Sequence, residues 1–187
     1  MVGRMVPRLL AVALPLVLAA CSGGGTGTPS PTQSQPPGLF SPGVLPTADQ
    51  LCHLLTVDDW TAAGLTGARA PNVNHDPGPD AGSAYCTYAA NSGETGGLEL
   101  DAFVGPTLDD AKTTFAEIAQ SLPPSTAPNV SGIDDGLINT DGEQGFGAIL
   151  VRAGKLVVTI TLPISADAGT QLTSLTQLVL SRALALE

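Results

Sequence analysis

The chain has 187 residues, of which 43% are hydrophobic and 13% are charged, and its formal net charge is -10. Such an acidic chain would be repelled by phosphate backbones, which argues against nucleic acid as a partner. With 2 histidines and 3 cysteines it lacks the residues that most zinc or haem sites need, so we expect no metal and no other cofactor. Its length allows one domain and an additional unstructured segment.

Residues 1–20 predict a secretory signal peptide. Arg4 and Arg8 make its start basic, and an apolar run follows from Leu9 to Leu18. As a helix, this run would extend over about 15 Å, half of the roughly 30 Å hydrocarbon core of a bilayer. It is therefore too short to be a settled transmembrane helix, and the pattern is typical of a segment that is removed on export.

Cys21 directly follows the small residues Ala19 and Ala20, and this stretch resembles the lipobox of bacterial lipoproteins. The resemblance implies a thioether-linked diacylglycerol on Cys21 and cleavage between Ala20 and Cys21. The palmitate-type acyl chains of such an anchor attach a protein stably to a membrane without any protein span. The alternative is an ordinary secreted protein in which Cys21 is a free thiol.

Residues 21–47 predict the lipidated cysteine and a tether. Beyond Cys21 the segment is dominated by Gly, Pro, Ser and Thr and carries no charged side chain. Because it can bury little apolar surface, we expect it to be disordered, with a reach of about 28 Å. A single domain is expected over residues 48–187. The predicted location is the extracytoplasmic face of the cell membrane, with the lipid on Cys21 as the only anchor.

Capping residues and apolar spacing predict three helices in the domain. A short helix over 57–63 begins after Thr56 and ends at Gly64. A longer helix over 108–122 begins after Thr107 and ends before two prolines. The last helix carries one apolar stripe and a cation in its final turns, where the helix dipole favours positive charge. The stripe consists of Leu172, Leu175, Val179 and Leu186, and the cation is Arg182.

Between the helices the apolar residues recur with a period of two, which predicts strands. Residues 98–104 and 155–162 show this alternation, and 83–90 is a predicted partner strand. Residues 148–152 should pair with 155–162 over a turn at Ala153 and Gly154, and Asp141-Gly142 is a second hairpin signal. The order helix, strands, helix, strands, helix predicts an α+β fold, an antiparallel sheet with helices packed on it as an α/β sandwich.

Cys52 and Cys86 lie in the domain, and the expected compartment is oxidising. We expect a disulfide between them that ties the first helix to the strand around Cys86. In a chain-entropy model, a loop of about 35 residues corresponds to about 3.8 kcal/mol of stabilisation. The alternative is a redox-active pair, although the two cysteines do not form a Cys-x-x-Cys motif.

Residues 51–59 read Leu-Cys-His-Leu-Leu-Thr-Val-Asp-Asp, and residues 86–88 read Cys-Thr-Tyr. Together with the lipobox and the tether, these motifs resemble an actinobacterial, mycobacterial-type lipoprotein family that is grouped under a domain of unknown function. The Ile-Asp-Asp-Gly-Leu run at 133–137 fits the same pattern, whereas Tyr88 stands where Trp is more usual. The resemblance implies a compact α/β sandwich similar to PsbP-like folds, and it implies no established catalytic residues.

Familiar catalytic motifs are missing from the sequence, which has no Gly-x-Ser-x-Gly, Ser-x-x-Lys, P-loop or His-Glu-x-x-His pattern. Glu99 and Asp101 face the same side of a predicted strand and could form an acid–base pair, although an exposed sheet face also explains them. A pKa of about 6 for one of them would favour catalysis, whereas values of about 4 would exclude it. We expect His53 to be a partly exposed structural residue and His75 to be a solvated loop residue.

Two further features have alternative interpretations. The acidic residues Asp134, Asp135, Asp141 and Glu143 could suit calcium, but they lack the spacing of a helix-flanked calcium loop, so we expect turn chemistry instead. Trp60 is expected to pack in the core, with stacking on a ligand as the alternative.

These observations predict a non-catalytic envelope lipoprotein that binds a protein or a small molecule outside the membrane. One alternative is an envelope hydrolase or transferase that uses Glu99 and Asp101. The other is a carrier of an apolar lipid, which would need a sizeable apolar cavity between the sheet and the helices.

Overall fold

The computed structural model describes residues 44–74, 82–88, 97–142 and 145–184. The predicted signal peptide, Cys21 and most of the predicted tether lie outside these ranges. The helices are α1 (Ala48–Cys52), α2 (Val57–Ala62), α3 (Leu108–Ser121) and α4 (Ala168–Leu184). The strands are β1 (Asn72–Asn74), β2 (Ser83–Thr87), β3 (Glu99–Val104), β4 (Asp135–Asn139), β5 (Phe146–Ala153) and β6 (Leu156–Pro163).

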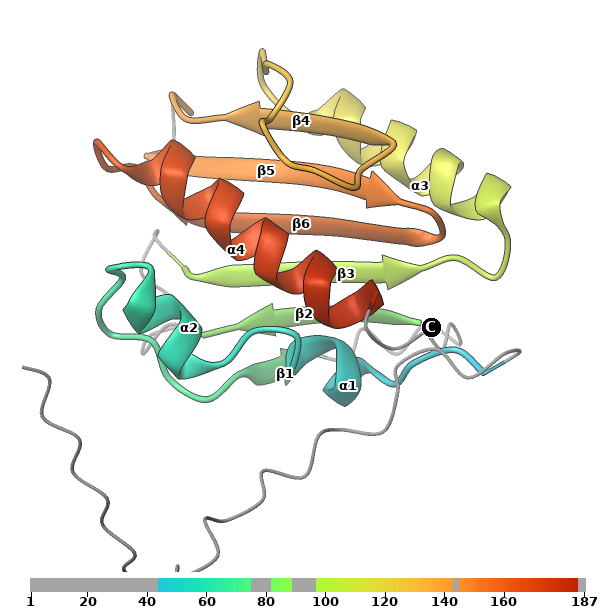
Figure 1. Ribbon diagram of the computed structural model, residues 1–187, viewed down its shortest axis with the longest axis horizontal. Coiled ribbons are helices and arrows are strands. Elements are labelled where there is room, and N and C mark those ends of the chain that lie inside the picture. Colours follow the sequence, from blue (N-terminus) through green and yellow to red (C-terminus); the bar gives the residue numbers. More distant parts are fainter. Residues whose placement is uncertain (1–43, 75–81, 89–96, 143–144, 185–187) are drawn as a thin grey trace, which may run out of the picture. The chain divides into compact units, whose positions relative to one another are not determined.

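These strands form one antiparallel sheet in the order β1-β2-β3-β6-β5-β4. Helices α1, α2 and α4 lie on one face of the sheet, here called the inner face, and α3 lies on the opposite, outer face (Figure 1). The predicted α+β class and the order helix, strands, helix, strands, helix are therefore confirmed.

Alternation along the strands decides which side chains enter the core. On β3, Leu100 and Ala102 are buried on the inner face, while Asp101 between them points outward and is exposed. Because opposite residues of paired strands point to the same side, the register assembles rows across the sheet. One inner row runs through Cys86, Leu100, Ile160 and Ile149.

Three of the described helices begin with a capping box, in which a threonine hydroxyl and the side chain three residues later each accept a backbone N–H. The boxes predicted at Thr56 and Thr107 are confirmed, and Thr47 forms a third one before α1. Leu45 packs against the core, so the packed part of the chain begins before Ala48.

The two longer helices each bury one face against the sheet, and on α4 it is the predicted apolar stripe. On α4, Leu172, Leu175 and Val179 are buried against the inner face of the sheet, whereas Leu186 lies outside the described residues. On α3, Ala111 is fully buried above Leu150 and Val157 of the outer face. Leu108, in the first turn of α3, does not join this contact and is 42% exposed.

Sequence periodicity did not predict α1, β1 or β4. The first two have 5 and 3 residues, too few to show a period. β4 is an edge strand of mostly half-buried residues, so its sequence does not alternate clearly. Backbone hydrogen bonds between Thr126 and Ile138 partly satisfy its free edge.

The hairpin between β5 and β6 is present as predicted, but its turn is displaced by one residue. Ala153 pairs with Leu156, so Gly154 and Lys155 form the turn rather than Ala153 and Gly154. Gly154 has a φ of 56°, a left-handed conformation that glycine adopts without the steric cost other residues incur.

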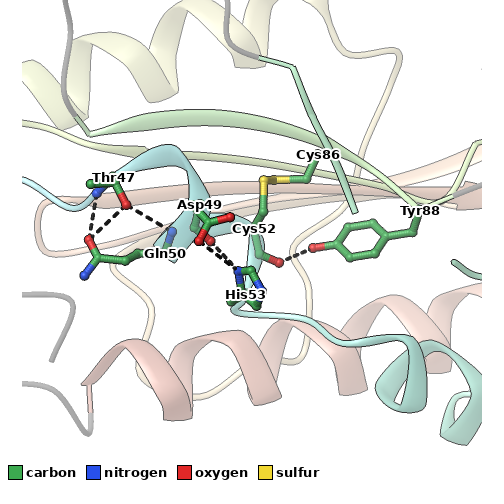
Figure 2. Close-up of a disulfide and its surroundings, with 7 residues drawn as sticks. All are labelled: Thr47, Asp49, Gln50, Cys52, His53, Cys86 and Tyr88. Carbon is green, nitrogen blue, oxygen red and sulfur yellow. Dashed lines mark hydrogen bonds and ion pairs between the residues drawn. A yellow bond between two sulfur atoms is a disulfide. The ribbon is translucent and has the colours of Figure 1, made fainter. Parts of the chain in front are cut away.

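A disulfide joins Cys52 at the end of α1 to Cys86 in β2, with a distance of 2.04 Å between the sulfur atoms (Figure 2). Both cysteines are fully buried. Tyr88 follows on the same face, and its hydroxyl donates a hydrogen bond to the Cys52 carbonyl oxygen. The first helix is therefore held against β2 by a covalent bond and by a buried hydrogen bond.

Candidate functional site

Helix α3 covers only part of the outer face, because it packs against β5 and β6. Beside it, outward-pointing residues of β2, β3 and β6 are partly or largely exposed. We call this region the open face, and it consists of Tyr85, Thr87, Glu99, Asp101, Thr159 and Thr161. The register places these residues in two adjacent rows of three, Tyr85–Asp101–Thr159 and Thr87–Glu99–Thr161.

Tyr85 is the exposed aromatic residue of the open face, with 37% of its surface accessible. Its hydroxyl hydrogen-bonds to the carboxylate of Glu99 on the neighbouring strand. Partial burial raises the pKa of Tyr85 to about 12, and the hydrogen bond to Glu99 and the negative charges of Glu99 and Asp101 act in the same direction. The phenol therefore stays protonated and remains a donor at neutral pH.

Glu99 and Asp101 lie two residues apart on β3, so their side chains point the same way at a spacing of about 7 Å. Neighbouring groups on the sheet partly desolvate the Asp101 carboxyl and so raise its pKa, although the residue as a whole is exposed, and the negative charge of Glu99 raises it further. A raised pKa is one requirement of a general acid. It also arises wherever two carboxylates share a face without a cation, so the catalytic interpretation of this pair stays a prediction.

Among the described residues, the outer face carries one buried cation, and two carboxylates neutralise it. The side chain of Arg152 on β5 is 7% exposed. Its Nε and Nη2 donate to Oδ2 of Asp135 at 2.8 and 2.6 Å, and its Nη1 donates to Oδ2 of Asp134 at 2.9 Å. Asp134 also accepts the backbone N–H of Gly154 at 2.8 Å, which connects the network to the β5–β6 turn.

A second ion pair joins α4 to α2 on the inner side of the sheet. Arg182 donates to both carboxylate oxygens of Asp59, at 2.6 and 2.9 Å, and to the carbonyl oxygen of Leu54 at 2.7 Å. Burial alone would raise the pKa of Asp59, but hydrogen bonds from Arg182 and Thr56 and the charge of Arg182 lower it below its usual value. The pair therefore stabilises the fold above the unfolded-state pKa of Asp59, and this contribution is lost as the pH falls through the lowered value.

Both described lysines contact groups outside the open face. Lys112 on α3 pairs with Asp109 at 3.5 Å, and Lys155 donates to the carbonyl oxygen of Pro106 at 2.8 Å. Arg69 is exposed and precedes β1 in the chain. Within the described ranges, the open face itself thus carries two carboxylates and no lysine or arginine.

Trp60 lies in the core as predicted, and it is fully buried rather than open to a ligand. Its ring centroid lies 5.1 Å from that of Tyr88, with an angle of 52° between the ring planes. Its Nε1 has no hydrogen-bond partner among the described residues. Burial raises the pKa of Tyr88, and the charge of Asp59 raises it further, which keeps its hydroxyl a donor.

The predicted candidate residues are distributed over different parts of the fold. His53 caps α1, is exposed, and lies with its Nδ1 2.7 Å from the Asp49 carbonyl oxygen (Figure 2). Asp141 is an exposed turn residue whose backbone N–H donates to the Asn139 side chain at 3.0 Å. His75 and Glu143 lie outside the described residues, as do Ala20 and Cys21.

Within the described ranges, His, Cys, Asp and Glu residues nowhere form a group of three or more that could hold a metal ion. Asp134 and Asp135, which the sequence offered as possible calcium ligands, both bind Arg152 instead. In the same part of the chain, the helices are too short or too polar for any of them to cross a membrane.

Sequence reasoning identified Glu99 and Asp101 but did not identify Tyr85 as their neighbour. The signal was partly available, because an inward-facing Cys86 requires Tyr85 to point outward. What the sequence lacked was the register between β2 and β3, which puts Tyr85 opposite Asp101.

The fold and the site define the class of this protein: an α+β domain with an open antiparallel sheet, one part of whose outer face is free of a described helix. Comparisons of the chain with known protein families, with curated proteins and with solved structures found no match. Membership in the actinobacterial lipoprotein family therefore stays a prediction from the sequence motifs, as does the likeness to PsbP-like folds.

Proposed function

We propose that this chain is a lipoprotein of the cell envelope, anchored by lipid on Cys21, whose α+β domain binds a partner through the open face without catalysing a reaction. The lipobox-like sequence before Cys21 and the uncharged tether support the anchor. The disulfide between Cys52 and Cys86 fits an oxidising compartment outside the cytoplasm.

The observation that carries the binding role is the asymmetry of the sheet. Its inner face is packed against helices, with fully buried residues such as Trp60 and Leu172 between the layers. On the outer face, polar residues and the Tyr85 ring stay accessible beside α3. A sheet face that combines an exposed aromatic ring with hydrogen-bonding groups has the composition of a recognition surface.

Replacing Cys21 with alanine tests the anchor. We expect the C21A variant to leave the membrane fraction, to appear in the medium and to lose palmitate labelling, because no acyl chain can then be attached. Fractionation followed by immunoblotting measures this. Ser22→Ala is the matched control and should stay in the membrane, and retention of the C21A variant there would refute the anchor.

Photo-cross-linking in intact cells of the native host tests the binding role. A photoreactive phenylalanine analogue at position 85 keeps an aromatic ring on the open face, and the same analogue at Ser174 places it on the exposed side of α4. We expect a discrete adduct from position 85 and none from position 174. Equal labelling from both positions, or no adduct from position 85, would contradict binding through the open face.

A further inference from the structure

The open face combines two kinds of group that recognise cations. The carboxylates of Glu99 and Asp101 point outward at a spacing of about 7 Å. The Tyr85 ring lies directly beside Asp101 in the register and is 37% exposed. Carboxylates attract ammonium and guanidinium groups, and the face of an aromatic ring binds the same groups through its quadrupole.

Within the described part of the chain, neither Glu99 nor Asp101 forms an ion pair with a lysine or arginine. Desolvation raises the pKa of Asp101, the negative charge of Glu99 raises it further, and no cation acts in the opposite direction. Lys112, Arg152, Lys155 and Arg182 each contact other groups, as described above. The connections 75–81 and 89–96, which border β2 in the sequence, contain acidic residues and no lysine or arginine.

We infer that the open face is a docking surface for an extended, basic protein segment in which cationic side chains alternate with small polar ones. This inference rests on the proposed binding role and adds the chemistry of the partner. It follows from charge complementarity, because the cationic side chains of such a segment can pair with the negative carboxylates of Glu99 and Asp101.

Spacing favours an extended segment over a compact one. Alternate side chains of an extended peptide recur every 6.5 to 7 Å or so, which matches the distance between the two carboxylates. One cation can therefore pair with each carboxylate, and the cation at Asp101 also lies beside the Tyr85 ring. Thr159 and Thr161 continue both rows, and their hydroxyl groups can accept hydrogen bonds from the same cationic side chains.

The test uses the full-length chain in a non-ionic detergent and short synthetic peptides as probes. One peptide alternates Arg and Thr, and the reference peptide alternates Gln and Thr. Fluorescence polarisation measures the Kd of each at low and at high salt. We expect the Arg peptide to bind more tightly than the Gln peptide, with an affinity that falls as salt is added.

Two double variants localise the binding. Glu99→Gln with Asp101→Asn removes the carboxylates of the open face and should weaken the Arg peptide about tenfold. Asp49→Asn with Asp58→Asn removes the same charge from exposed positions on α1 and α2, and it should leave the affinity unchanged. Equal losses in both double variants would mean attraction to net charge alone and would overturn the inference.

The Tyr85 ring is tested separately. Tyr85→Leu should weaken binding about threefold, whereas Tyr85→Phe, which keeps the ring, should not. Binding of a neutral oligosaccharide in place of the Arg peptide would also overturn the inference, although it would leave recognition by the open face intact. If position 85 forms an adduct in cells but the Arg peptide does not bind, the basic partner is refuted and the binding role is not. If neither experiment shows binding, the binding role is refuted as well.

Discussion

Replacing both Cys52 and Cys86 with alanine will lower the free energy of unfolding by about 4 kcal/mol. The bridge closes a loop with a sequence separation of 34 and so restricts the unfolded chain. This contribution is a large share of the net free energy of unfolding of a typical domain, which is only about 5–15 kcal/mol. Urea unfolding followed by the fluorescence of Trp60, the 1 tryptophan of the chain, measures the loss.

Tyr88→Phe is the matched control for this double variant. It removes the hydrogen bond to the Cys52 carbonyl oxygen but keeps the disulfide, so the expected loss is about 1 kcal/mol. Because both cysteines are fully buried, a reductant should reach the bond slowly until the domain opens. Unfolding midpoints that do not change on reduction or in the alanine variant would contradict the stabilising role.

Features that depend on short-range pattern could be predicted from the sequence. The capping boxes at Thr56 and Thr107 can be recognised from a threonine and an aspartate three positions later. The alternation on β3 and β6 fixes which side chains enter the core, because a strand with one buried face leaves little freedom of register. The α+β class follows from the order of these elements.

Features that depend on contacts between distant segments could not be predicted. β3 pairs with β6 although α3, β4 and β5 lie between them in the sequence. The local periodicity of either strand does not indicate that pairing. The same is true of Arg182, which the sequence placed near a helix end but could not connect to Asp59. The candidate site was therefore predicted in part: Glu99 and Asp101 follow from one strand, whereas the position of Tyr85 required the sheet.

The Asp134-Asp135 pair shows how such a contact changes the interpretation of a motif. In sequence the two residues belong to the Ile-Asp-Asp-Gly-Leu run and could suit a cation. In the structure their cation is Arg152, which lies 17 and 18 positions further along and opposite Asp135 in the register. The aspartates are about half exposed, while the Arg152 side chain is almost completely buried.

This difference in burial predicts an asymmetric response to mutation. Asp134→Ala with Asp135→Ala leaves the buried guanidinium of Arg152 without its charged partners, and we expect a loss of about 3 kcal/mol in the free energy of unfolding. Arg152→Met removes the buried charge and leaves two half-exposed carboxylates that water can solvate. Its expected loss is smaller, about 1 kcal/mol. Urea unfolding at neutral pH compares the two variants.

Asp109→Ala is the control, since Asp109 is largely exposed and pairs with Lys112 only at the surface, so its loss should leave stability unchanged. The burial argument would be contradicted if Arg152→Met lowered the free energy of unfolding more than the double aspartate variant does. If the order is as expected, Arg152 is a structural cation that Asp134 and Asp135 already satisfy. It is then not available to neutralise Glu99 and Asp101 on the same side of the sheet, as the proposed pairing of these carboxylates with a basic partner requires.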